Sequence, residues 1–123
     1  MKSNNSNKKD LFSEKQDDID RLENEIDSSF EAIVSLAKAN SPNFLARFQD
    51  VYPHFCNKIT EIYPEINNTE LIFCAYLRLN FSSKEIANYT FVTPKTIQMK
   101  KYRLRKKLSI PSDQDINIWM YKL

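Results

Sequence analysis

A run of basic residues toward the C-terminus carries the strongest chemical signal in the sequence. Seven lysine or arginine residues and no acidic residue lie between positions 95 and 107. They are Lys95, Lys100, Lys101, Arg103, Arg105, Lys106 and Lys107. Side chains of one sign at this density attract a polyanion, and their confinement to one segment indicates a specific docking face. The net charge of +2 hides this feature, because positions 10–31 hold nine acidic and two basic residues.

Helical periodicity divides this basic segment into two faces. At about 100° per residue, Ile97, Leu104 and Leu108 share one side, which we expect to pack on a core. The opposite side holds Lys95, Met99, Tyr102 and Lys106, flanked by Gln98 and Arg103. Methionine and tyrosine among lysines suit the DNA major groove, where apolar side chains meet thymine methyls and cations reach phosphates. The alternative is a basic face that only keeps the helix soluble.

Capping residues define the two helices that would present this face. Ser82-x-x-Glu85 is a capping box that opens a short helix. Thr93 and Pro94 supply the N-cap and the first residue of the next helix, which we expect to span residues 94–108. A short capped helix, a turn and a longer basic helix predict a helix-turn-helix whose second helix enters the major groove of double-stranded DNA.

The whole chain is expected to be all-α. It has no glycine, which argues against hairpin-rich β structure and against a glycine-rich phosphate loop. We expect a disordered tail at 1–10, a long amphipathic or coiled-coil helix at 11–40 and a helical connector at 41–65. A four-helix helix-turn-helix domain follows at 66–123. There, Asn67-x-x-Glu70 forms another capping box, and Asn80 is expected to end that helix in the left-handed conformation.

The N-terminal helix could join two copies of the chain. Apolar residues recur every three or four positions at Ile19, Leu22, Ile26, Ile33 and Leu36. Isoleucine at the a position with leucine at the d position suits a parallel two-stranded coiled coil. An amphipathic helix that folds back on its own domain explains the same spacing equally well.

A second apolar stripe ends the sequence. We expect Ser112 to cap a final helix with Ile116, Trp119, Met120 and Leu123 on one side. Such a stripe either closes the core or meets a partner subunit. We expect Trp119 to point inward and the outer edge, with Trp119 and Met120 as candidate dimerisation residues, to be available to a homodimer.

No residue pattern predicts catalysis, a metal site or a cofactor. The single histidine, His54, has no acid, base or nucleophile partner in the sequence, so we do not expect an enzyme. Cys56 and Cys74 lie among apolar neighbours and are expected to be buried free thiols of a reducing cytoplasm. No window approaches the roughly 20 apolar residues of a membrane span, and the polar start is not a signal peptide. We therefore expect a cytoplasmic protein.

Residues 66–123 resemble the DNA-binding domain of the LuxR/GerE family of bacterial transcription regulators. The sequence K-E-I-A at 84–87 is similar to the motif of one helix of that family, and T-P-K-T-I at 93–97 is similar to its S-x-x-T-V. Leu104-x-x-Lys107-Leu108 matches I-x-x-K-L at the right distance, and I-N-N-T-E at 66–70 is a looser match to L-T-x-x-E.

The resemblance implies a four-helix domain whose third helix reads the major groove, often as a dimer that packs through the fourth. By position, it implies base contacts from Gln98, Met99 and Tyr102. It implies phosphate contacts at or near Lys84, Thr93, Thr96 and Lys100. Lys100 stands where the family commonly has histidine, and Asn80 stands where it has glycine before the second helix.

This variant of the domain, with R-L-R-K-K-L at 103–108, also resembles the C-terminal segments of larger sensor-regulators that carry helical repeats. An upstream sensor protein is therefore an expected partner, beside DNA and a second copy of the chain. Two alternatives stay open. One is a helical interaction or adaptor protein that acts through its N-terminal coiled coil. The other is a polymerase-associated module similar to region four of sigma factors.

Overall fold

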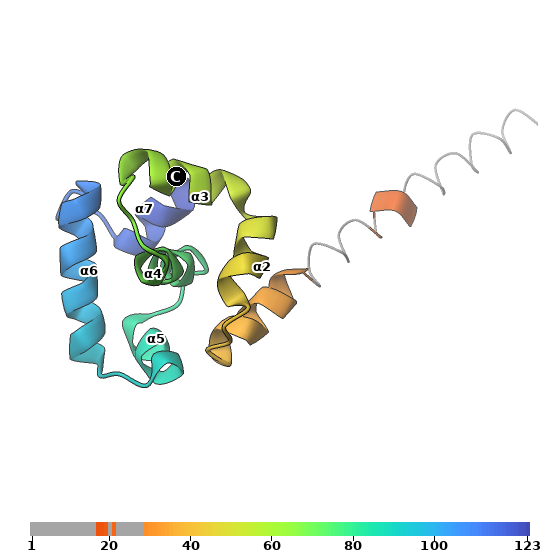
Figure 1. Ribbon diagram of the computed structural model, residues 1–123, viewed down its shortest axis with the longest axis horizontal. Coiled ribbons are helices and arrows are strands. Elements are labelled where there is room, and N and C mark those ends of the chain that lie inside the picture. Colours follow the sequence, from red (N-terminus) through yellow and green to blue (C-terminus); the bar gives the residue numbers. More distant parts are fainter. Residues whose placement is uncertain (1–16, 20, 22–28) are drawn as a thin grey trace, which may run out of the picture. The chain divides into compact units, whose positions relative to one another are not determined.

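The computed structural model describes residues 17–19, 21 and 29–123, and all regular secondary structure in them is helical, which confirms the all-α prediction (Figure 1). Contacts divide the chain into two compact units, Met1–Ala32 and Ile33–Leu123. In the first unit, the Arg21 guanidinium lies 3.1 Å from Asp18 Oδ1. The predicted tail at 1–10 and the predicted coiled-coil residues Leu22 and Ile26 lie outside the described residues.

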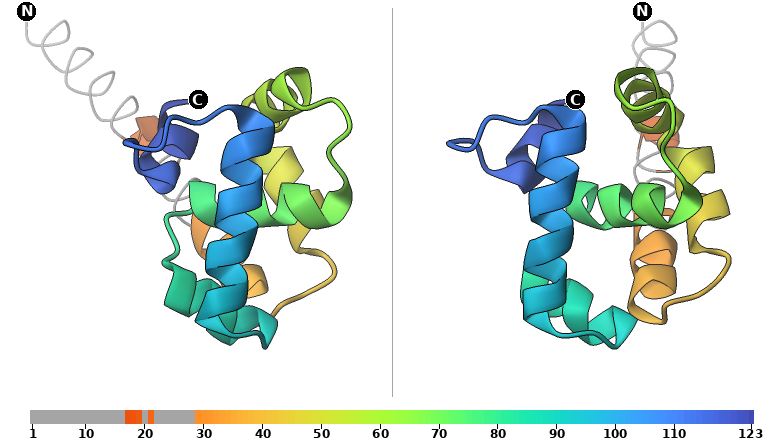
Figure 2. Two further views of the ribbon diagram at one scale, coloured as in Figure 1. Left: turned by 90° about the vertical axis from the view of Figure 1, so that its left-hand side faces the viewer. Right: turned by 60° about the vertical axis from the view of Figure 1, so that its left-hand side comes forward.

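The second unit begins with a helical segment at 33–38, which six further helices follow. They are α2 (Phe44–Val51), α3 (Pro53–Ile62), α4 (Asn68–Arg78), α5 (Ser83–Thr90), α6 (Pro94–Leu108) and α7 (Ile116–Lys122). Helix α4 lies in the middle, between α2 and α6 (Figure 1). Helices α5 and α7 lie near opposite ends of α6 (Figure 2). This arrangement leaves one long side of α6 uncovered.

The central position of α4 explains its composition. Six of its residues are buried: Leu71, Phe73, Cys74, Ala75, Tyr76 and Leu77. The Tyr76 ring lies 4.9 Å from the Phe44 ring of α2, and the Phe48 ring of α2 lies 5.7 Å from the Phe55 ring of α3. Helices α2 and α3, which we expected to act as a connector, therefore share one apolar core with α4 to α7.

Most helix ends follow the predicted caps. The side chains of Asn67 and Ser82 accept hydrogen bonds from the backbone N–H three residues later, and both capping boxes are complete. Thr93 caps α6 in the same way. Asn80 has φ 66°, the predicted left-handed conformation. Each of these predictions is confirmed, since each depends on contacts within a few residues.

The predicted cap of the last helix was wrong. Asp115, and not Ser112, caps α7, because Asp115 Oδ1 accepts a 3.0 Å hydrogen bond from the Ile118 N–H. The guanidinium of Arg105 explains the later start. It donates to the carbonyl oxygens of Pro111 (3.4 Å) and Gln114 (2.7 Å), which holds residues 111–114 in a loop.

Phe91, the C-cap of α5, should be a site where the fold can be stabilised. Its backbone is left-handed, with φ 58°, and its side chain is 85% exposed. A side chain with a Cβ is disfavoured in this region, whereas asparagine tolerates it. We expect Phe91→Asn to raise the free energy of unfolding by about 0.5–1 kcal/mol in urea denaturation. Phe91→Ala, which keeps the steric cost, should give no gain; a loss of stability in Phe91→Asn would contradict the prediction.

Candidate nucleic-acid interface

Helices α5 and α6 meet at a tight turn that sets the orientation of α6. The chain leaves α5 through left-handed Phe91, and the Val92 N–H donates to the Ala87 carbonyl at 3.0 Å. Thr93 then starts α6. Ile97, Leu104 and Leu108 of α6 are buried with 1%, 3% and 3% of their surface exposed, as periodicity predicts. The opposite side of α6 must therefore face outward.

The outer face of α6 consists of Lys95, Met99, Tyr102 and Lys106, all exposed. Met99 exposes 48% and Tyr102 61% of its surface. The ammonium of Lys106 lies 4.4 Å from the centre of the Tyr102 ring, a distance at which a cation and an aromatic face attract each other. The structure thus brings the four predicted groove residues together on one side of one helix.

Along the α5 side of α6, several predicted contact residues also hold the two helices together. The Gln98 amide donates to Ser83 Oγ at 3.1 Å, across the turn. The hydroxyls of Thr93 and Thr96 lie 3.0 Å apart. Lys84 is exposed near the start of α5. Base reading by Gln98 would require its amide to exchange Ser83 for a base edge.

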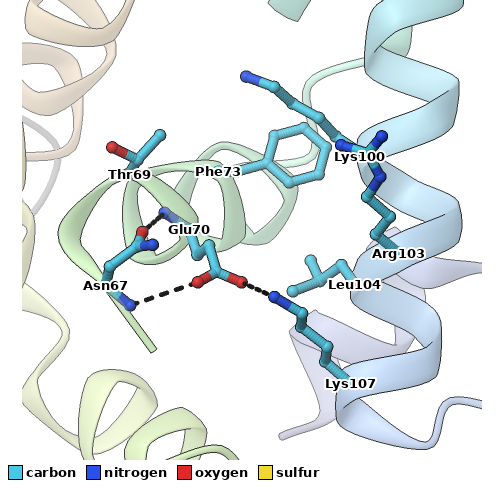
Figure 3. A pocket seen from close by; sticks show the side chains of 8 residues that line it. All are labelled: Asn67, Thr69, Glu70, Phe73, Lys100, Arg103, Leu104 and Lys107. Carbon is cyan, nitrogen blue, oxygen red and sulfur yellow. Dashed lines mark hydrogen bonds and ion pairs between the residues drawn. The ribbon is translucent and has the colours of Figure 1, made fainter. Parts of the chain in front are cut away.

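On the α4 side, charged residues form a network that joins α4 to α6. Glu70 Oε2 lies 3.1 Å from Lys107 Nζ, and Glu70 Oε1 accepts from the Tyr63 hydroxyl at 3.2 Å. Lys100 and Arg103 lie beside this network at a pocket between the two helices (Figure 3). Sequence reasoning missed the ion pair, because 37 residues separate its partners.

The seven basic residues of α6 therefore have different surroundings. Arg105 holds the loop before α7, and Lys107 is paired with Glu70. Burial lowers the pKa of Lys101. Four others, Lys95, Lys100, Arg103 and Lys106, form no hydrogen bond or ion pair with any residue in the part of the chain that the structure describes. An external anion that binds these four has no anionic partner to displace among the described residues.

The predicted dimerisation residues are scattered. Ile33 and Met120 have 0% of their surface exposed and lie in the core, so neither can touch a second subunit in this fold. Leu36 and Trp119 are partly buried against the same core, and Ile19 of the first unit is 48% exposed. The predicted apolar stripe of α7 faces the core, so other residues of α7 face outward. Its exposed apolar residues are Ile118 (54%) and Tyr121 (71%).

Within the described ranges, no group of three or more His, Cys, Asp or Glu side chains could hold a metal ion. Cys56 and Cys74 are buried free thiols, as predicted, and burial raises the pKa of Cys74 to about 12. No helix in the described part of the chain has the length and apolar character to cross a membrane.

Comparison of the chain with protein-family models, with curated proteins and with solved structures finds no match. The function must therefore be inferred from the motifs of the sequence and from the geometry of α4 to α7.

Proposed function

We propose that this chain is a sequence-specific DNA-binding transcription regulator. In this proposal α5 and α6 form a helix-turn-helix, and the outer face of α6 lies in the major groove. The observation that carries the proposal is that face itself: a helix with exposed methionine and tyrosine between lysines that have no anionic partner among the described residues. The resemblance of residues 66–123 to the LuxR/GerE domain agrees with it.

The side chains of the outer face of α6 are better suited to contact with the DNA major groove than to contact with water. The major groove presents thymine methyls and base-edge donors and acceptors between two rows of phosphates. Met99 and Tyr102 can contact the floor, while Lys95 and Lys106 reach phosphates. Exposing two large side chains to water among lysines brings no folding stability, so a partner that covers them is the simpler explanation.

The surroundings of α6 hold it rigidly, as base reading requires. Caps at Ser82 and Thr93 fix the start of α5 and of α6, and Ile97 anchors α6 in the core. The Gln98–Ser83 hydrogen bond ties the two helices together. A contact that distinguishes one base from another needs this positional accuracy, because a shift of about 1 Å breaks a hydrogen bond.

The protein acts as a homodimer in this proposal, through the outer side of α7. Ile118 and Tyr121 form an exposed apolar patch there, and the Arg78 guanidinium lies 4.8 Å from the centre of the Tyr121 ring. Aromatic and arginine side chains are enriched at protein interfaces. A twofold dimer would present two copies of α6 to a palindromic site.

Selection of bound duplexes from a random DNA pool tests the proposal. We expect one enriched consensus, arranged as an inverted repeat with half-sites about one helical turn apart or a multiple of it. The affinity for that site should fall steeply as salt rises, because each neutralised phosphate releases counterions. A selected pool that shows no enrichment over the input, at any salt concentration, would contradict sequence-specific binding.

A further inference from the structure

A pocket of about 230 Å³ lies between the first turn of α4 and the side of α6 (Figure 3). Thr69, Glu70 and Phe73 line it from α4, and Lys100, Arg103 and Lys107 line it from α6. In Figure 3 the side chains of Lys100 and Arg103 extend along the upper part of the pocket, and Glu70 with Lys107 occupies the lower part. The volume exceeds that of a single tetrahedral oxyanion.

The charges of the pocket do not cancel. Glu70 is its one carboxylate, and both oxygens of Glu70 already have donors. Oε2 accepts from Lys107 at 3.1 Å, and Oε1 accepts from the Tyr63 hydroxyl at 3.2 Å and from the Asn67 N–H at 3.5 Å. Glu70 is therefore committed to other groups, which leaves the charges of Lys100 and Arg103 without an anion among the described residues.

Apolar and cationic side chains line the pocket together. Phe73 and Leu104, which also line the pocket, are buried with 7% and 3% of their surface exposed. Arg103 is exposed and Lys100 is partly buried, so an anion can enter the pocket from solvent. Arginine offers a planar fork of donors, lysine a point charge and threonine a hydroxyl, a combination suited to the oxygens of a phosphate.

We propose that this pocket seats one backbone phosphate of the DNA strand that passes α6 on its α4 side. This inference rests on the proposed function and extends the contact surface to Thr69, outside the helix that enters the groove. At about 100° per residue, Arg103 and Lys100 lie about 60° and 120° around the axis from Lys106. A helix in the major groove has a phosphate strand on each side, so this flank of α6 faces one of them.

Salt titrations of Lys100→Gln with Arg103→Gln test the shared pocket. Since both side chains of one subunit serve one phosphate, the double variant should lower the slope of log K against log salt by about one per half-site, or by about two for a homodimer on its full site. The control, Arg47→Gln with Lys58→Gln, removes the same charge from α2 and α3 and should leave the slope unchanged. Loss of about two units per half-site would mean two separate phosphates, and no loss would mean no contact; either result would overturn the proposal.

Methylphosphonate substitution locates the phosphate. Each phosphate of the selected site is replaced in turn by its uncharged analogue, and wild type and double variant are compared. We expect one position per half-site where the substitution weakens wild type and does not weaken the variant further. Thr69→Val should lower affinity about 2- to 10-fold at unchanged slope, since it removes a neutral donor. If no methylphosphonate position behaved in this way, the assignment of the pocket to a DNA phosphate would be wrong.

Titration with inorganic phosphate separates DNA from a small phosphorylated ligand. Amide NMR shifts of Thr69 and Arg103 would report its binding. We expect weak, millimolar binding that the double variant abolishes. Submillimolar binding, together with an unchanged DNA slope in the double variant, would assign the pocket to a small ligand and overturn the DNA assignment.

If wild type binds no DNA at all, the proposed function fails; if wild type and double variant bind DNA alike, only the pocket assignment fails.

Discussion

Replacing Phe48 of α2 with alanine should lower the free energy of unfolding by about 3–5 kcal/mol. Its side chain has 0% of its surface exposed. Its ring lies 4.7 Å from that of Tyr52, 5.7 Å from that of Phe55 and 5.8 Å from that of Phe44. Truncation therefore removes the aromatic centre that joins α2 to α3. Because domains are stable by only about 5–15 kcal/mol, urea denaturation should show a large shift of the midpoint.

The same experiment shows whether α2 and α3 fold together with α4 to α7. The core is continuous from Phe48 through Phe44 and Tyr76 to Ile97, so we expect one transition in which every helix melts together. Gln49→Ala, at the exposed neighbouring position, is the control and should change stability by less than about 0.5 kcal/mol. If Phe48→Ala instead produced two transitions, with α6 retained in the second, residues 66–123 would fold independently.

Local chemistry made most of the helix ends predictable. A capping box depends on two residues three positions apart, as at Ser82 and Glu85, and its hydrogen bonds form wherever a helix begins. In the structure, the hydrogen bond from the Ser82 backbone N–H holds the pKa of the Glu85 carboxyl below its usual value. The left-handed Asn80 was predictable for the same reason, because the conformational preference belongs to the residue itself.

Contacts between distant residues were not predictable from the sequence. Ser112 and Asp115 are both good caps, and the choice between them depends on the guanidinium of Arg105. Ile33 has the spacing of a coiled-coil residue, but it is buried in the core of the second unit. Periodicity shows which face of a helix is apolar and does not show what that face meets.

The candidate site was predicted in part. Placing the residues of α6 around a helix at about 100° per residue put Ile97 on the buried side and Tyr102 on the exposed side, and both positions are confirmed. It also placed Lys106, and not Lys107, on the outer face, but it could not show that Lys107 has an anionic partner. Lys107 lies beside Glu70, 37 residues earlier, and Lys106 lies over the Tyr102 ring. Which cations can reach an external anion is therefore set by tertiary packing.

Replacing Lys95 and Lys106 with glutamine should weaken DNA binding about sixtyfold per half-site at roughly 0.1 M salt, because a slope of about −0.9 per phosphate contact corresponds to about eightfold for each contact at that concentration. The slope of log K against log salt should fall by nearly two per half-site, or by nearly four for a homodimer on its full site. Both lysines are exposed on the outer face of α6, so the fold should be unaffected. Fluorescence anisotropy with the selected duplex, at several salt concentrations, measures both quantities.

The matched control is Arg47→Gln with Lys58→Gln, which removes the same charge from α2 and α3. General electrostatic attraction to DNA depends on net charge, so it would weaken binding equally in both pairs. A docked α6 predicts a large loss in the first pair and little in the second. Tyr102→Ala adds a third readout: a lost base contact should cost about 1–3 kcal/mol, with the salt slope unchanged. If both double variants lost affinity for DNA equally and Tyr102→Ala had no effect, the outer face of α6 would not lie in the groove.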